Sequence, residues 1–394
     1  ILLVGSSRAR DEARALMGER EDIHLIQVQP TTGRSAATFV HEELQDLYLQ
    51  RAPECEKAAA GWSGNEAPLP ALEGLTRLLT GVARRHQREA VAVDVGGSTV
   101  GVVGVVQSRL VTWSRADFGV GRGAGGILAA CGPAKILRWL PFDADEDEVI
   151  NWAAERALHP AAPSITPRQL AIEYAFVREA LLLACDESQS RWPDLPAAAR
   201  ADLIVGTGSL LSSLAHPAHA ALALLDSLQP QALGTGLVQL SLDTLSLLPQ
   251  LGTLMAVDED AVYSVTERDA LLNLGTVIVP LGKAKEGSEA VTVTVRRTGG
   301  ASTTVDVPYG SLRVVPLPER ESAQLIVSPT SSFAIGSFAR GGELRTPAQE
   351  GIEGGAIGII IDARGRPLTP PEDRKQRRQC MLEWWREMGI SHDW

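Results

Sequence analysis

Apolar runs and amphipathic stretches alternate through the first part of the chain. Residues 1–4, 23–28 and 90–95 are short continuous apolar runs typical of buried strands, whereas residues 11–20 and 72–85 have the spacing of helices. The first strand, helix and strand follow one another closely enough to predict a parallel crossover unit. The pattern therefore predicts an α/β protein.

The pattern continues with a hairpin and then mainly with helices. Two apolar runs flank Gln107-Ser108-Arg109, which predicts two antiparallel strands joined by a tight turn. Thr166 followed by Pro167 favours a helix start, because threonine caps the first turn and proline fits its first position. The other elements expected before residue 275 are helices at 146–158 and 166–185 and a strand at 203–205.

The character of the sequence changes after about residue 275. Short β-branched runs separated by Gly and Pro recur at intervals of roughly ten residues, which is typical of a small all-β sandwich or barrel. These runs lie at 276–279, 290–295, 302–307, 312–315, 324–327 and 358–362. The chain then closes with an expected amphipathic helix that carries Trp384 and Trp385.

The chain is acidic, with a formal net charge of −11. Nucleic acids and anionic membranes both favour a basic surface, so neither is expected as a partner. The basic run Arg374–Arg378 is interpreted as the solvated face of a helix. No apolar run reaches the ~18 residues that a membrane span needs, and no signal peptide is recognised, so we expect a cytoplasmic location.

The cysteines indicate the redox compartment, and the first residues suggest how the chain relates to a longer protein. Cys55, Cys131, Cys185 and Cys380 are widely spaced and form no C-x-x-C pair. Such isolated cysteines fit a reducing compartment better than a disulfide framework or a zinc site. The chain opens at Ile1 with a strand already under way, so we interpret it as the C-terminal fragment of a longer protein.

The most informative stretch is Val91-Ala92-Val93-Asp94-Val95-Gly96-Gly97-Ser98-Thr99. Its two glycines let the backbone turn tightly and bring N–H groups close to an anion, and the two hydroxyls add donors. Asp94 at the end of the strand can hold a hydrated Mg²⁺ or orient a water. A strand, not a helix, follows the glycines, which separates the stretch from the P-loop and from the dinucleotide fingerprint. The alternative is an ordinary glycine turn between two strands.

A second small-residue turn, Gly206-Thr207-Gly208, follows the strand expected at 203–205 and precedes a helix. Glycines at such a turn permit the close approach of a ring or a ribose, and a helix N-terminus favours negative charge. Taken alone, the turn is equally explained as a tight connection between a strand and a helix. Its interest lies in its position downstream of the first turn, with helices between the two.

Three other stretches are candidates that we assign mainly to structure. His216 and His219 have no evident carboxylate partner, so a capping or surface role is favoured over metal binding. The acidic run at 143–148 lacks the EF-hand spacing and is typical of a helix N-terminus. The glycine-rich stretch at 119–126 could be a second anion loop, but is interpreted as a flexible link into a helix.

The order of the two turns resembles the second half of the actin, Hsp70 and sugar-kinase superfamily. In that superfamily a D-x-G-G turn binds the β- and γ-phosphates, and a later glycine turn lines the adenosine pocket. More specifically, the chain resembles the MutL family named for the glutamate mutase accessory protein, which is distinct from the mismatch-repair protein of that name. The family carries V-D-V-G-G-A-T-T-D, D-L-G-M and I-G-T-G-G blocks. The counterparts here are Val93-Asp94-Val95-Gly96-Gly97-Ser98-Thr99, Asp117-Phe118-Gly119-Val120 and Val205-Gly206-Thr207-Gly208-Ser209.

The resemblance, which covers roughly residues 1–275, implies an α/β fold with an actin-like (ribonuclease H-like) domain, a small all-β domain and a C-terminal helix. We expect residues 1–90 to be the remainder of an actin-like half and residues 91–275 to be a nucleotide-binding half with a helical insertion. Residues 276–366 would form the β-sandwich or barrel, and residues 367–394 the amphipathic helix.

The resemblance also implies a function. The cofactors would be ATP and Mg²⁺, and the partners would be subunits of an adenosylcobalamin-dependent mutase such as glutamate mutase, which the protein would reactivate like a chaperone. A homo-oligomer is a further candidate assembly. Asp94 would be the catalytic and metal-binding residue. The cofactor-binding residues would be Gly96, Gly97, Ser98 and Thr99 at the phosphates and Gly206, Thr207 and Gly208 at the nucleoside.

Two departures from the family pattern support a rival hypothesis. After Thr99 the chain has Val100 and Gly101, where the family has Thr and Asp, and no first D-x-G turn is found before residue 90. Because phosphoryl transfer depends on positioning and on metal-held charge, we expect at most a weak ATPase. The rival is a degenerate, non-catalytic actin-like scaffold for protein–protein interaction. A sugar or acetate kinase would need the missing first turn and an acceptor base, and neither is identified.

Overall fold

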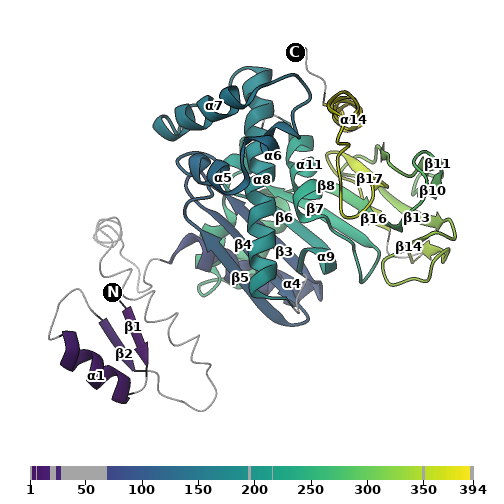
Figure 1. Ribbon diagram of the computed structural model, residues 1–394. Coiled ribbons are helices and arrows are strands. Elements are labelled where there is room, and N and C mark those ends of the chain that lie inside the picture. Colours follow the sequence, from purple (N-terminus) through teal and green to yellow (C-terminus); the bar gives the residue numbers. More distant parts are fainter. Residues whose placement is uncertain are drawn as a thin grey trace. The chain divides into compact units, whose positions relative to one another are not determined.

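The computed structural model describes residues 2–5, 7–17, 24–27, 69–193, 197–214, 216–347 and 351–390. The chain is divided into two units, Ile1–Pro70 and Ala71–Trp394 (Figure 1). In the first unit, β1 (Leu2–Gly5) and β2 (His24–Gln27) are parallel and α1 (Ser7–Met17) connects them, which confirms the predicted crossover. The rest of the expected 1–90 segment up to residue 68 lies outside the described residues.

The second unit is built on an eight-stranded sheet with the strand order β12-β17-β8-β7-β6-β3-β4-β5 (Figure 1). Five of these strands are β3 (Ala90–Val95), β4 (Val100–Val106), β5 (Arg109–Arg115), β6 (Leu203–Thr207) and β7 (Leu237–Asp243). The first three form an antiparallel meander, and β6 and β7 run parallel to β3. This is the arrangement of one half of an actin-like (ribonuclease H-like) fold, so the predicted fold class is confirmed.

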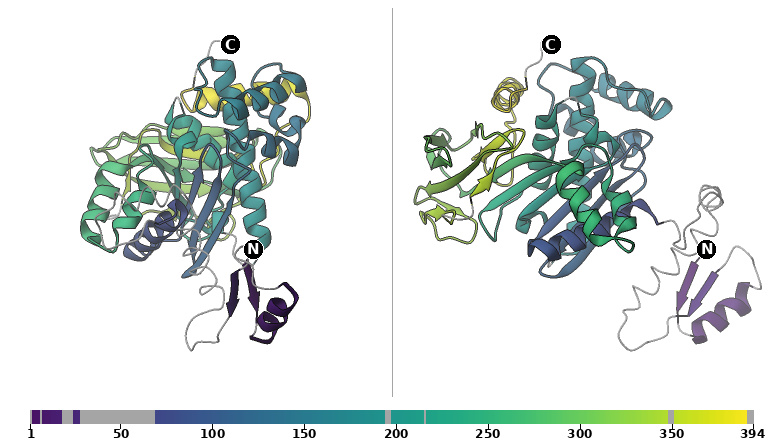
Figure 2. Two further views of the ribbon diagram at one scale, coloured as in Figure 1. Left: turned by 90° about the vertical axis from the view of Figure 1, so that its left-hand side faces the viewer. Right: turned by 180° about the vertical axis from the view of Figure 1, so that it is seen from behind.

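Helices cover both faces of this sheet, and the alternation of side chains along β3 explains why. Val91, Val93 and Val95 belong to the core beneath one helical layer, whereas Ala90 and Ala92 belong to the core beneath the other. The first layer includes α5 (Ala124–Cys131), α6 (Pro133–Leu137), α7 (Glu146–Leu158), α8 (Pro167–Arg191) and α11 (Pro217–Leu228). The second consists of α4 (Ala71–His86), α12 (Leu248–Leu254) and α13 (Glu259–Val265), which the view from behind in Figure 2 brings forward. Two short helices are α9 (Ala197–Arg200) and α10 (Ser209–Ser212), and a π-helical turn spans Thr266–Ala270.

Several local predictions are confirmed by cap geometry. Asp145 accepts a hydrogen bond from the backbone N–H of Glu148 at 2.9 Å, so the acidic run marks the start of α7. Thr166 and Gln169 form a reciprocal capping box at the start of α8. His216 caps α11 by accepting from the N–H of Ala218 at 3.1 Å. None of the described helices combines the length and the apolar character needed to cross a membrane.

The β-rich part of the chain is arranged differently from the expected separate domain. Three of its strands, β8 (Leu271–Ile278), β12 (Leu312–Val315) and β17 (Gly358–Asp362), extend the large sheet. A second, five-stranded sheet contains β10 (Glu289–Arg297), β11 (Ser302–Pro308), β13 (Ser322–Pro329), β15 (Leu344–Arg345) and β16 (Ile352–Glu353). A small ribbon pairs β9 (Pro280–Gly282) with β14 (Phe333–Ile335).

The reason for this difference is that β17 is buried on both sides. Ile359 and Ile361 pack into the core shared with the five-stranded sheet, whereas Ile360 packs into the core beneath α8 and α11. A strand with two apolar faces needs a covering layer on each side. The eight-stranded sheet therefore contains strands of the actin-like part together with β8, β12 and β17. The five-stranded sheet packs against β17 at one end of that large sheet.

The expected C-terminal helix is α14 (Arg374–Glu387), and it closes over the first helical layer. The ring of Trp385 lies edge-on to Tyr174 of α8 and to His219 of α11, at centroid distances of 5.3 and 5.2 Å. Trp384 packs under the guanidinium of Arg364 at 4.6 Å. The two tryptophans thus explain the burial of one side of an otherwise charged helix.

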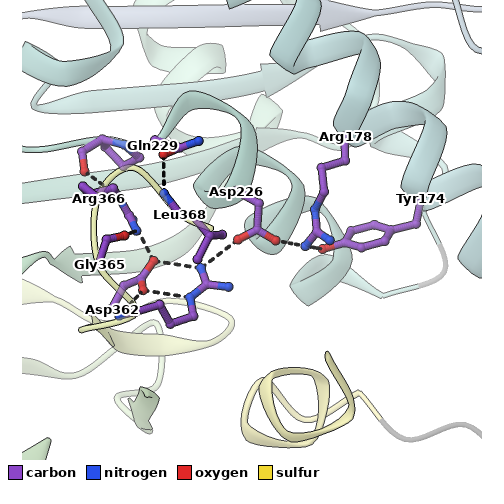
Figure 3. Close-up of polar contacts among 10 residues, drawn as sticks. Tyr174, Arg178, Asp226, Gln229, Asp362, Gly365, Arg366 and Leu368 are labelled. Carbon is purple, nitrogen blue, oxygen red and sulfur yellow. Dashed lines mark hydrogen bonds and ion pairs between the residues drawn. The ribbon is translucent and has the colours of Figure 1, made fainter. Parts of the chain in front are cut away.

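A buried network of charges joins β17 to α8 and α11 (Figure 3). Arg364 lies 2.7 Å from Asp226 of α11 and 2.8 Å from Asp362, and Arg366 lies 2.7 Å from Asp362. Arg178 of α8 also pairs with Asp226, and the side chains of Arg178, Asp226, Asp362 and Arg364 are 0% exposed. Burial alone would raise the pKa of Asp362, but the two adjacent guanidinium groups outweigh burial and hold that pKa well below its usual range.

Candidate functional site

The two glycine turns lie side by side at one edge of the large sheet. Strands β3 and β6 are neighbours and parallel, with Asp94 opposite Thr207. The carboxyl ends of parallel strands form the edge at which open α/β sheets bind ligands. The turns are in close contact, because a Cβ added to Gly208 would lie 2.2 Å from Oδ1 of Asp94. The structure therefore brings the two predicted motifs together.

The first turn, residues 96–99, is closed by a hydrogen bond from the N–H of Gly96 to the carbonyl of Thr99 at 2.9 Å. Ser98 and Thr99 are exposed, and among the described residues nothing pairs with their hydroxyls. A Cβ added to Gly97 would have no atom within 4 Å, so there is open space above the turn. The turn thus presents hydroxyl donors and accessible backbone to solvent, as an anion site requires.

A second glycine-rich segment supports this turn from the side. The N–H of Gly119 donates to the carbonyl of Ser98 at 3.3 Å, and that of Val120 donates to the carbonyl of Gly96 at 3.0 Å. A Cβ added to Gly119 would lie 2.2 Å from the backbone of Ser98. The stretch at 119–126, interpreted from sequence as a flexible link, is therefore packed backbone to backbone against the turn.

Asp94 is the half-buried carboxylate of the site, and no described residue donates a hydrogen bond to it. Burial raises the pKa of Asp94, and the negative charge of Asp243 raises it further. Asp243 itself is fully buried at the end of β7. It accepts hydrogen bonds from the hydroxyl of Thr207 at 2.7 Å and from the N–H groups of Leu247 and Leu248, each at 2.9 Å.

Asp243 was not predicted from sequence as part of the site. The available signal was the alternating run Leu237–Asp243, an apolar strand that ends in an acidic residue much as β3 does. Its carboxylate links the second turn, through Thr207, to the start of α12. Because all three of its bonds are to protein groups, Asp243 positions the site and is not open to a ligand.

The second turn is closed off from solvent. Gly206, Thr207 and Gly208 are all buried, and the side chain of Thr207 is committed to Asp243. A Cβ added to Gly206 would lie 3.3 Å from Leu224 of α11. These residues contact neighbouring strands and helices in the structure, and their contact with a nucleoside stays a prediction.

The departure at Gly101 has a structural counterpart. Gly101 is opposite Asp94 in the β3–β4 ladder, so a side chain at this position would project beside Asp94. A Cβ added there would lie 2.8 Å from Cδ1 of Leu72, the second residue of α4. Leu72 therefore occupies the space in which the family's aspartate would stand.

The carboxylates available for a metal are correspondingly few. In the described parts of the chain there is no group of three or more His, Cys, Asp or Glu side chains suited to a metal ion. Magnesium does not require one, since it keeps several waters and commonly binds through one or two carboxylates and the phosphates of a substrate. Asp94 fits that limited role.

Replacing Asp94 with asparagine is expected to raise the melting temperature at neutral pH by roughly 1–3 °C. The folded-state pKa is raised, so the ionised carboxylate lowers stability and the loss develops as pH rises above the ordinary aspartate value. Thermal unfolding of wild type and Asp94→Asn between pH 3 and 8 checks this, and the difference should vanish below about pH 4. A variant less stable than wild type at pH 7 would contradict it.

The fold is that of an actin-like α/β protein, and its two glycine turns meet at one edge of the large sheet. A family model described as MutL protein matches residues 1–270. The chain therefore belongs to the MutL protein family, as its motifs predict. The comparison with curated proteins gave no match.

Similar solved structures include three proteins. Component A of the (R)-2-hydroxyglutaryl-CoA dehydratase of Acidaminococcus fermentans is 14% identical, with 49% of this chain and 68% of that chain covered and a TM-score of 0.24. An archaeal actin homologue is 14% identical, with 35% and 42% covered and a TM-score of 0.20. A nucleotide-free acetone carboxylase is 11% identical, with 78% and 57% covered and a TM-score of 0.31. The chain thus spans about half the length of the last two.

Proposed function

We propose that this chain is an actin-like accessory factor that binds a nucleotide and reactivates an adenosylcobalamin-dependent mutase such as glutamate mutase. Its place in the MutL family supports the mutase as partner. The observation that carries the nucleotide part is the solvent-facing turn at residues 96–99, beside a half-buried carboxylate that no described residue satisfies. Buried polar groups normally have partners, so such a carboxylate is suited to an incoming ligand.

Each residue of the site has a role in this proposal. The backbone at Gly96 and Gly97 and the hydroxyls of Ser98 and Thr99 would hold the phosphates of ATP, and Asp94 would hold a hydrated Mg²⁺. Bound Mg²⁺ supplies positive charge that offsets the phosphate oxygens. The second turn, Gly206 to Gly208, would support Asp94 from its buried side, since Gly208 packs directly against that carboxylate.

Hydrolysis is expected to be weak at most. Leu72 stands where the family has a second carboxylate beside Asp94, so fewer groups are left to position metal and water. The same observation favours the rival function, a non-catalytic actin-like scaffold that contacts protein partners. The two proposals differ in whether the effect on the mutase needs nucleotide.

A reactivation assay tests the proposal. Glutamate mutase is first inactivated with hydroxocobalamin and then incubated with this chain, Mg·ATP and fresh adenosylcobalamin. We expect mutase activity to recover with wild type and to stay at background with Asp94→Asn. The matched control is Asp260→Asn, whose side chain is 95% exposed at the start of α13, and it should behave like wild type.

Other outcomes separate the alternatives. Recovery that needs neither ATP nor Asp94 would favour the scaffold over the nucleotide-binding factor. If the wild-type chain binds Mg·ATP but mutase activity does not recover, the role in mutase reactivation is contradicted. Nucleotide binding by the site would not be contradicted by that result.

A further inference from the structure

We propose that Arg122 is a further phosphate-binding residue of the candidate site, and that its guanidinium pairs with a phosphate group held at the turn 96–99. The proposal rests on the nucleotide-binding part of the proposed function. It adds a positively charged side chain to a turn that otherwise offers hydroxyls and backbone N–H groups. The class of ligand for such a site is a polyphosphate, either a nucleoside triphosphate or inorganic tripolyphosphate.

The charges at this edge of the sheet explain why a cation is needed. Asp94 and Asp243 are both carboxylates, and the negative charge of Asp243 contributes to the raised pKa of Asp94. Leu72 fills the space beside Gly101 where the family has a second acidic residue, so fewer groups hold a metal ion. A phosphate chain brought to this edge is repelled by the carboxylates unless positive charge offsets them.

The backbone on both sides of Arg122 is fixed close to the turn. A Cβ added to Gly121 would lie 2.6 Å from the carbonyl oxygen of Gly97 and 3.0 Å from its Cα. A Cβ added to Gly123 would lie 2.4 Å from the backbone nitrogen of Gly119, and both Gly121 and Gly123 are buried. Arg122 between them is exposed, so its side chain extends from a packed segment into solvent.

The side chain of Arg122 is long enough to reach a ligand at the turn. Adjacent Cα atoms are about 3.8 Å apart, so the Cα of Arg122 lies within roughly 8 Å of the Cα of Gly97. A Cβ added to Gly97 would have no atom within 4 Å, which leaves open space above the turn. The methylene stem of an arginine can carry its charged head across such a distance.

The guanidinium of Arg122 is also uncommitted. It makes no hydrogen bond or ion pair with any residue that the structure describes. Arg115, on the same connection between β5 and α5, provides a contrast, because it donates to Asp117 at 2.7 Å and also pairs with Glu187. A solvated arginine is ordinary on a protein surface, but Arg122 stands between two buried glycines of the segment packed on the turn. Its planar set of donors matches the oxygens of a phosphate group.

Calorimetric titration of tripolyphosphate and of ATP, each with Mg²⁺, into the full chain tests the proposal. We expect Arg122→Gln to weaken the binding of both ligands about tenfold, or ~1.4 kcal/mol. Arg122→Lys keeps the charge but loses the planar pair of donors, so it should weaken binding only about threefold. Rescue by lysine would show that the charge of residue 122 contributes to binding.

The matched control is Arg109→Gln. Arg109 is likewise exposed and makes no hydrogen bond or ion pair with a described residue, and it is opposite Val106 at the hairpin end of the β4–β5 ladder. The site lies at the other end of that ladder, where Val100 is opposite Arg115. The control removes the same charge from the chain, and it should bind both ligands like wild type.

The two ligands separate this proposal from the proposed function. Equal binding of ATP by wild type and Arg122→Gln would overturn the role of Arg122 and leave nucleotide binding uncontradicted. Binding of tripolyphosphate that depends on Arg122, without binding of ATP, would support the role of Arg122 and contradict the nucleotide function. The proposal is also overturned if wild type binds neither ligand, or if Arg109→Gln loses as much affinity as Arg122→Gln, since overall charge would then be the cause.

Discussion

Replacing Asp362 with asparagine is expected to lower the free energy of unfolding of the second unit by about 3–5 kcal/mol. Asp362 is fully buried and balances both Arg364 and Arg366, at 2.8 and 2.7 Å. Without its charge, Arg366 loses its carboxylate partner, and Arg364 is left with Asp226, which already pairs with the buried Arg178. Breaking one member of a buried ion network leaves an uncompensated charge, which costs far more than the loss of a surface pair.

The loss should depend on pH in a defined direction. The folded-state pKa of Asp362 is depressed, so its stabilisation is present above the ordinary aspartate pKa and is lost as pH falls toward the folded value. The difference between wild type and Asp362→Asn should thus be constant from about pH 5 to 8 and shrink below about pH 4.

Urea unfolding followed by tryptophan fluorescence measures this loss, since Trp384 lies directly on Arg364. The matched control is Asp306→Asn on β11, an exposed aspartate that accepts a hydrogen bond from Thr292 at 2.7 Å. It should shift the free energy of unfolding by less than about 1 kcal/mol. Equal urea midpoints for Asp362→Asn and wild type would contradict the claim that this charge network stabilises the second unit.

Replacing Gly119 with alanine is expected to weaken Mg·ATP binding by tenfold or more while the protein stays folded. The new Cβ would lie 2.2 Å from the backbone of Ser98, so either the loop or the turn at 96–99 must move. Neither contact can give way through a side chain, because both partners are backbone. Displacement of donors by about 1 Å is enough to lose most of the benefit of a preorganised site.

Gly125→Ala is the matched control for this change. Gly125 lies in the first turn of α5, and a Cβ added to it would have no atom within 4 Å. Alanine there removes the same glycine flexibility from the same segment without touching the turn, so binding should equal that of wild type. Calorimetric titration of both variants checks the prediction. Wild-type affinity in Gly119→Ala would show that the turn does not hold the phosphates.

Local sequence signals predicted the elements closest to the site. The strand that ends in Asp94, the hairpin after it and the cap at Thr166 are each determined by residues a few positions apart, and all are present as expected. The acidic start of α7 was predicted for the same reason. Caps and tight turns depend on near neighbours and are therefore readable from one sequence.

The features that were missed depend on distant partners. The run at 358–362 was recognised as a strand, but its insertion beside β8 in the large sheet follows from packing on both faces. Asp243 could not be assigned to the site from sequence, because it joins the site only through its hydrogen bond with Thr207 on another strand. The role of Gly119 was hidden because a glycine-rich stretch has the same composition whether it is flexible or packed against backbone.

The most direct test of the account is a calorimetric titration of Mg·ATP into the wild-type chain, with Asp94→Asn and Asp260→Asn titrated in parallel. The account predicts binding in the micromolar range for wild type and for Asp260→Asn, and none for Asp94→Asn. The absence of heat at millimolar ATP with folded wild-type protein would contradict nucleotide binding by this chain. Equal binding by Asp94→Asn would contradict the site at residues 94–99.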